Sequence, residues 1–358
     1  MDGLVLPVGG FACGFLAGFA AQYGRLCTIG AIEDAVIAGD FRRAGAWAVS
    51  GALAIIFTQA IVFSGALDLS TTHYVHPRLE LMGLLVGGLL FGLGAALVGT
   101  CAFGLLVRLG TGDLRALICA IVLGLAAFAA TGGVLSPLRL GLSELMTVDT
   151  SSVGGKTLNG IVAAKFGSLA GLMSVVLVPV ALLTFALTNL RLYRKPRLIA
   201  ASCLIGCAIG GGWLSTGVLA DPFGSQRPES LSFVAPLGRL LLQFMGETLS
   251  TTSFSVATLF GVAGGSFAMA AARNELRWEA FDDQREMRRH LLGALLMGAG
   301  GVLARGCTIG QGLSGTSTLS IAAPIAVFAM VIGAWIGLLH LIQGKVLFAR
   351  WRQTGTAR

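Results

Sequence analysis

Long apolar stretches separated by short charged segments are the feature that most limits how this chain can fold. Runs of about 18 or more residues with almost no charge recur along its 358 residues, and such runs are typical of helices that cross a bilayer. Charged residues make up only 12% of the chain, about half the usual share of a soluble domain. The sequence therefore predicts an all-α polytopic membrane protein, and its 52 glycines favour closely packed and interrupted helices.

The apolar stretches predict nine transmembrane helices in a single membrane domain, residues 1–358. They cover residues 4–22, 44–67, 81–107, 113–131, 168–188, 198–219, 250–272, 290–304 and 321–343. No basic segment precedes the first stretch, so we expect it to be a retained helix rather than a cleaved signal.

Basic residues gather in alternate loops, and this pattern predicts the orientation in the membrane. The clusters are Arg42 and Arg43, Arg108 and Arg115, the segment 191–197, the segment 273–289, and the segment 345–358. Because cytoplasmic loops carry the excess of Lys and Arg, we expect Met1 and residues 132–166 to face the periplasm and both the segment 273–289 and the C-terminus to face the cytoplasm. The same pattern explains the net charge of +8 without nucleic-acid binding.

A polar hexapeptide, R-x-C-T-I-G, occurs twice in this apolar chain. Arg25–Gly30 follows the first span and Arg305–Gly310 follows the eighth, so the two copies enter the membrane in opposite directions. Fainter relatives are G-T-C-A-F-G at 99–104 and G-C-A-I-G at 206–210. Pairing Cys27 with Cys207 and Cys101 with Cys307 maps spans one to four onto spans six to nine. The predicted architecture is an inverted-repeat helical bundle with short broken or re-entrant helices, in which residues 1–131 and 198–358 are the repeats and residues 132–197 are a connector with the fifth span.

The motif suits the binding of a small sulfur-containing anion. Glycines allow the helix to break, and a broken helix presents N–H groups that bind anions. A thiol is a weak donor with a polarizable sulfur, which favours a soft partner. The candidate substrate-binding residues are Cys27, Cys101, Cys307, Arg25, Arg305, Gly30, Gly104, Gly310, Thr28 and Thr308. The two arginines suit helix anchoring at the membrane interface equally well, and Cys13, Cys119 and Cys203 are expected only to pack as small hydrophobes.

No metal, cofactor or disulfide framework is predicted. The seven cysteines include no C-x-x-C pair, and disulfide frameworks belong to small secreted domains. Apart from Glu80, no cysteine or carboxylate lies at metal-binding spacing from His73 and His76.

Three segments resemble conserved blocks of the YeeE/YedE family of bacterial inner-membrane sulfur transporters. They are GRLCTIGAIEDA, LVGTCAFGLLVRLGTGDLRAL and LMGAGGVLARGCTIGQGLSGTS. The resemblance covers most of the chain and implies a multi-pass protein of the inner membrane, not an enzyme, that takes up thiosulfate. It further implies that Cys27, Cys101 and Cys307 hand the ion on by S–H hydrogen bonds, and that a small cytoplasmic TusA-like sulfurtransferase is a partner. The motifs leave open another sulfur or selenium species as cargo.

Two other interpretations compete with transport. A membrane thiol enzyme, either a sulfurtransferase or a redox carrier, would form persulfides or disulfides on these cysteines, and mass spectrometry after substrate exposure would detect the added sulfur. A structural subunit would keep its uptake after Cys→Ala changes at all three sites. The wide spacing of single cysteines ranks the enzyme below the transporter.

Overall fold

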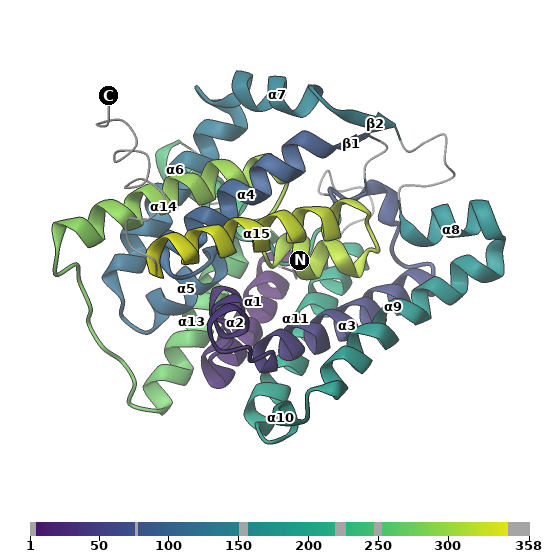
Figure 1. The fold of residues 1–358 in the computed structure, drawn as a ribbon, viewed down its shortest axis with the longest axis horizontal. Helices are drawn as coiled ribbons and strands as arrows, with labels where there is room; N and C mark the ends of the chain where they lie inside the picture. The colour runs from purple at the N-terminus through teal and green to yellow at the C-terminus, as the bar shows by residue number, and fades with distance from the viewer. Residues whose placement is uncertain (1–4, 76–77, 150–156, 219–226, 247–252, 343–358) are drawn as a thin grey trace, which may run out of the picture.

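The computed structural model describes residues 5–75, 78–149, 157–218, 227–246 and 253–342, and these residues are mostly helical (Figure 1). The helices of the first half are α1 (Val5–Gly24), α2 (Thr28–Ile37), α3 (Arg42–Phe63), α4 (Leu81–Val98), α5 (Ala102–Gly110), α6 (Leu114–Gly132) and α7 (Ser136–Glu144). Those that follow are α8 (Leu158–Phe166), α9 (Ser168–Thr188), α10 (Leu190–Tyr193), α11 (Pro196–Gly217), α12 (Val234–Met245), α13 (Phe254–Ala272), α14 (Gln284–Leu303), the π-helical η5 (Gly310–Gly315) and α15 (Ala322–Ile342).

The only described sheet is a small antiparallel ribbon. A short 3-10 turn, η2 (Leu69–Thr71), precedes strand β1 (Arg78–Glu80), which pairs with β2 (Thr147–Asp149) so that Arg78 lies opposite Asp149. All the other named elements in the described residues are helices, so the all-α prediction is confirmed.

Eight helical stretches among the described residues are long and apolar enough to cross a membrane. They agree with eight of the nine predicted spans, although two of them, Val5–Ile37 and Leu81–Gly110, contain a helix break. The remaining prediction, 290–304, is the apolar part of α14, whose first turns carry Arg285, Arg288 and Arg289. The chain is therefore a multi-pass membrane protein.

The helix contacts come in corresponding pairs. Helix α1 packs against α13, and α11 packs against α3; α4 packs against α15, and α14 packs against α6. Like these four, two further pairs, α1 with α11 and α4 with α14, join the two halves of the chain. The shorter helices follow the same rule, because α2 contacts α3 and α15 while α12 contacts α13 and α6.

Glycines allow the backbones of the main pairs to approach closely. A Cβ atom at Gly18 of α1 would lie 2.1 Å from the Val262 carbonyl oxygen of α13, and one at Gly265 of α13 would lie 2.1 Å from the Phe15 carbonyl oxygen of α1. Such approach is typical of membrane helices, which associate through packing rather than through the hydrophobic effect.

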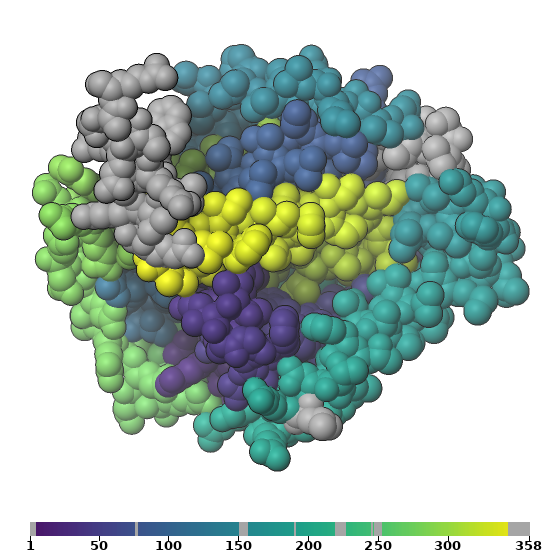
Figure 2. Space-filling model, in the orientation of Figure 1, coloured from purple at the N-terminus to yellow at the C-terminus, as the bar shows by residue number. Residues whose placement is uncertain are grey.

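The spanning helices place the connections at two opposite ends of the molecule. We call the end that carries Arg25, Arg42, Arg197 and Arg273 the basic end, and the end that carries β1, β2 and α8 the ribbon end. Arg273 donates to the Tyr23 carbonyl at the basic end, and Leu158 N–H donates to the Leu319 carbonyl at the ribbon end. Between the two ends, α15 (yellow) crosses the visible face between α4 (blue) and α2 (dark purple) (Figure 2).

Candidate functional site

The first R-x-C-T-I-G copy breaks the helix between α1 and α2. Arg25 has a left-handed backbone conformation, with φ of 51°, which is uncommon for a residue other than glycine. Cys27 then takes an extended conformation as the residue before α2, and its carbonyl accepts from the Ala31 N–H. The extended residue and the new helix start leave the N–H groups of the first turn of α2 without helical partners.

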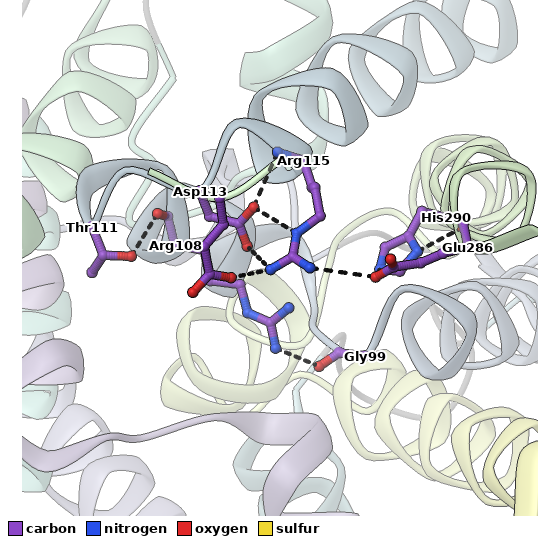
Figure 3. Close-up of polar contacts among 8 residues, drawn as sticks. Gly99, Arg108, Thr111, Asp113, Arg115, Glu286 and His290 are labelled. Carbon is purple, nitrogen blue, oxygen red and sulfur yellow. Dashed lines mark hydrogen bonds and ion pairs between the residues drawn. The ribbon is translucent and has the colours of Figure 1, made fainter. Parts of the chain in front are cut away.

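A second break separates α4 from α5. Gly99 ends α4 with φ of 77°, and Cys101 is the extended residue before α5. Arg108, in the last turn of α5, donates to the Gly99 carbonyl at 3.2 Å (Figure 3). Its side chain therefore connects the end of α5 to the residue that ends α4. Nearby, Arg115 ties the start of α6 to α14 through ion pairs with Asp113, Glu279 and Glu286.

The third break carries the second hexapeptide copy. Arg305 follows α14 with φ of 57°, close to the value at Arg25, and Gly306 follows with φ of 159°. The Gly310 N–H donates to the Cys307 sulfur at 3.2 Å, and the Phe233 and Ile309 N–H groups also point to this sulfur. Cys307 is completely buried.

The first two breaks meet through a reciprocal set of contacts. The Cys27 sulfur lies 3.9 Å from the Thr100 hydroxyl oxygen, and the Cys101 thiol donates to the Thr28 hydroxyl oxygen at 3.8 Å. Cys101 also lies within electrostatic range of both Cys27 and Cys307. The predicted cysteines of three distant segments therefore lie together in the interior.

Thr308 joins this group from the third break. Its hydroxyl lies against the Cys101 thiol but makes no hydrogen bond of normal geometry within the described residues, although its oxygen is buried. A buried hydroxyl without a partner is costly, and an anionic substrate beside Cys101 would accept from it.

The glycine three residues after each cysteine leaves room for a polar side chain. A Cβ atom at Gly30 would lie 2.5 Å from the Arg43 guanidinium, one at Gly104 would lie 2.0 Å from the Thr100 hydroxyl, and one at Gly310 would lie 2.9 Å from the Ser232 hydroxyl. The spacing C-x-x-G thus brings one more donor against each break. The sequence did not point to Arg43 or Ser232, because neither lies near a cysteine along the chain.

The two motif arginines do not contact the cysteines in the described residues. Arg25 Nη2 pairs with Glu275 Oε1 at 2.9 Å at the basic end, where Gln22 also donates to Glu275. The Arg25 guanidinium lowers the pKa of the Glu275 carboxyl, so the pair is ionised at neutral pH. Arg305 pairs with Glu80 at the ribbon end. Each arginine therefore lies at one mouth of the cysteine cluster, bound to a carboxylate.

Cavities at the two mouths differ greatly in size. A basin of about 700 Å³ at the basic end is lined by six basic residues, Arg25, Arg42, Arg43, Lys195, Arg197 and Arg273, against two acidic ones, Asp34 and Glu275. At the ribbon end, the cavity beside Arg305 and Glu80 measures only about 20 Å³. Among the described residues, the protein is thus hollowed much more deeply at the basic end than beside Arg305 and Glu80 at the ribbon end.

A third cavity opens sideways, between helices. It measures about 510 Å³, and apolar residues of α2, α3, α4, α9 and α15 form most of its wall. Only Thr28, Thr308 and Thr316 contribute hydroxyls to the lining. Because Thr28 and Thr308 lie beside Cys101 while Leu182 and Phe185 belong to α9, this cavity extends from the cysteine cluster toward α9.

The other cysteines lie away from the cluster. Cys207 lies in the middle of the unbroken helix α11 with an exposed side chain, so the prediction that pairs it with Cys27 is wrong: its two glycines pack against Leu53 and Phe57 of α3 instead of breaking a helix. Cys119 is buried on α6, and the Cys13 sulfur lies 4.0 Å from the Ser215 hydroxyl. Of the histidine pair, His76 lies outside the described residues.

The family follows from comparison of the whole sequence. The sequence model of a family described as Sulphur transport matches residues 23–336, a range that includes all three cysteine breaks. The chain belongs to this Sulphur transport family. The family and the names of its members indicate a transporter and not an enzyme. The chain is therefore a transporter rather than the membrane thiol enzyme considered above.

Two curated relatives are similar to this Sulphur transport chain over nearly their full length. A protein of Escherichia coli (strain K12), named Thiosulfate transporter TsuA, is 26% identical over 342 residues, which cover 91% of this chain and 92% of the relative. A protein of the same name from Spirochaeta thermophila is 25% identical over 331 residues, 91% of this chain and 96% of the relative.

Proposed function

We propose that this chain takes up thiosulfate, or a closely related small sulfur anion, through a path lined by Cys27, Cys101 and Cys307. The observation that carries the proposal is the meeting of three helix breaks, where thiols, threonine hydroxyls and free helix N–H groups lie together inside a membrane protein. Two relatives named as thiosulfate transporters support the choice of cargo.

An anion inside a membrane needs hydrogen-bond donors that stabilise it, and these donors must also release it. Helix N-termini point positive ends at the ion, and each thiol adds a soft donor. Because these donors are individually weak, the ion is held without being trapped and passes from one cysteine to the next by S–H hydrogen bonds. Arg25 and Arg305 attract it at the two mouths, while Thr28, Thr308, Gly30, Gly104 and Gly310 complete the contacts.

The matched helix contacts support an inverted repeat. If α1, α3, α4 and α6 correspond to α11, α13, α14 and α15, every major contact among these eight helices has a counterpart. The repeats then cover residues 1–131 and 198–358, with residues 132–197 as the connector. Five spanning helices, α1, α3, α4, α6 and α9, precede α11, so the second repeat enters the membrane from the opposite side.

The orientation follows from the basic end. Because cytoplasmic loops carry the excess of Lys and Arg, the basic end faces the cytoplasm of a bacterium, across the inner membrane, and the N-terminus faces the periplasm. The cytoplasmic basin is then the place where a TusA-like sulfurtransferase would receive the ion. Reporter fusions in the segment 273–289 test the orientation, and a periplasmic signal there would contradict it.

The experiment for the cargo is growth on thiosulfate as the sole sulfur source, in cells that lack other importers. The wild-type gene should restore growth and uptake of ³⁵S-thiosulfate, and Cys101→Ala should abolish both at equal membrane expression. Wild-type expression without uptake would refute the proposal.

A further inference from the structure

The segment that leads into α12 places a hydroxyl group beside the third break. Residues 230–233 precede α12, with Phe233 as the last residue before the helix. Ser230 is structural, since its hydroxyl donates to the Ile209 carbonyl at 2.9 Å. Ser232 lies two residues later and is only partly buried, so its hydroxyl has a different environment.

Ser232 shares its surroundings with Cys307. A Cβ atom at Gly310 would lie 2.9 Å from the Ser232 hydroxyl oxygen and 3.5 Å from the Tyr74 hydroxyl oxygen. The N–H of Phe233, the next residue, points to the Cys307 sulfur. The Ser232 hydroxyl, the Tyr74 hydroxyl and the Cys307 thiol therefore surround the same glycine.

Tyr74 is held in position to act as a donor. Its ring packs edge-on against Trp213, with ring centres 6.1 Å apart, and its carbonyl accepts from the Ser320 hydroxyl at 2.7 Å. Its own hydroxyl lies in contact with the hydroxyls of Ser232 and Ser314, and burial raises the pKa of Tyr74 above its usual value. The Tyr74 hydroxyl is therefore protonated at neutral pH.

Ser232 lies next to the position in the fold that corresponds to that of Cys27. Helix α12 has the same relation to α13 and α6 as α2 has to α3 and α15. Cys27 directly precedes α2, and Ser232 lies within one residue of the matching position before α12. The segment before α2 thus carries a thiol directly before the helix, and the segment before α12 carries a hydroxyl one residue earlier.

We propose that Ser232 and Tyr74 form a hydroxyl contact that binds the oxygen atoms of the transported sulfur oxyanion. The inference rests on the proposed function and adds to it. A hydroxyl is a stronger hydrogen-bond donor to a hard oxygen than a thiol is, whereas the thiol suits a soft terminal sulfur. An ion with both kinds of atom is then oriented, its oxygens toward Ser232 and Tyr74 and its terminal sulfur toward Cys101 and Cys307.

The test is the kinetics of ³⁵S-thiosulfate uptake by Ser232→Ala and Tyr74→Phe at measured membrane expression. Loss of one hydrogen bond to a charged ligand costs about tenfold or more in affinity, so we expect KM to rise about tenfold in each variant. Ser232→Thr, which keeps the hydroxyl, should keep the KM within about threefold of the wild-type value, and Ser230→Ala is the matched control with an unchanged KM. Inhibition by sulfate, which offers only oxygens, should weaken in Ser232→Ala, while inhibition by hydrosulfide should not.

The outcomes separate this inference from the function on which it rests. Wild-type uptake with an unchanged KM in both variants would overturn the hydroxyl contact and leave the transport proposal standing. A chain that takes up no thiosulfate would overturn both. If Ser232→Ala does not reach the membrane, Tyr74→Phe carries the same prediction, because it retains the ring that packs against Trp213.

Discussion

The two copies of R-x-C-T-I-G begin with the same backbone and end in different surroundings. Arg25 and Arg305 have φ values of 51° and 57°, and each pairs with a glutamate from a distant part of the chain. Cys27 is only partly buried and precedes a regular α-helix, whereas Cys307 is completely buried and precedes a π-helical turn. The first copy opens on a basin of about 700 Å³ and the second on a cavity of about 20 Å³.

The difference shows which property belongs to the hexapeptide and which to its neighbours. The hexapeptide specifies the helix break, the left-handed arginine and the position of the cysteine. The neighbouring segments decide how open the break is. Among the described residues, His73, Tyr74 and the segments 78–80 and 320–322 line the small cavity at the second copy, whereas the basin at the first copy has no such segments in its lining. From the described residues, we interpret the structure as a state that is open at the basic end and closed at the ribbon end.

The largest expected effect comes from removing the two buried thiols, that of the second break and that of the second hexapeptide copy. Cys101→Ala and Cys307→Ala should each reduce ³⁵S-thiosulfate uptake to background, because each removes a buried thiol donor from the proposed path. Cys207→Ala is the matched control, since Cys207 is exposed on α11, and its uptake should equal that of the wild type. Full uptake by either buried-site variant would mean that the two copies do not share a path.

A smaller effect should distinguish the two ion pairs. Glu80→Gln removes the carboxylate that competes with an incoming anion for Arg305, so we expect the KM for uptake to fall severalfold. Glu275→Gln should change KM less, because Arg25 is 73% exposed and Arg305 only 33%, and exposed pairs contribute only about 0–1 kcal/mol. Uptake kinetics in right-side-out vesicles would measure both, and a larger effect at Glu275 would reverse our assignment of the closed end.

The smallest effect is a difference in how fast a thiol reagent modifies Cys27 and Cys307 in the unmutated protein. After brief exposure of the purified protein to a maleimide, mass spectrometry should find Cys27 modified and Cys307 largely unmodified, since only Cys27 is partly exposed. Cys119, which is also buried, is the internal control for slow modification. Equal modification of Cys27 and Cys307 would show that the ribbon end is as open as the basic end.

Much of the fold could be predicted from the sequence because membrane helices need long apolar runs. The fifth span, predicted at 168–188, coincides with α9 (Ser168–Thr188). The predicted span 81–107 ran through the break at Gly99 and Cys101, because apolar residues continue on both sides of it. Helix α14 begins six residues before the predicted 290, because its charged first turns lie at the basic end, where Glu286 pairs with Arg115.

The candidate site could be predicted only where a cysteine marked it. The same C-x-x-G spacing breaks a helix at Cys101 and packs one against α3 at Cys207, and local sequence does not distinguish a glycine that breaks a helix from one that lets helices approach. Ser232 and Arg43 belong to the site only through tertiary contacts. The short helix α12 escaped prediction because its 12 residues fall below the length of a membrane span.

The most direct test of the central claim is a structure of the protein in lipid nanodiscs with thiosulfate, determined by electron cryomicroscopy. We predict density for the anion between the helix breaks, in contact with Cys101 or Cys307 and within the space bounded by Thr28, Thr308 and Ser232. Density confined to the basic basin or to a lipid-facing surface, with the breaks empty at saturating thiosulfate, would contradict the account.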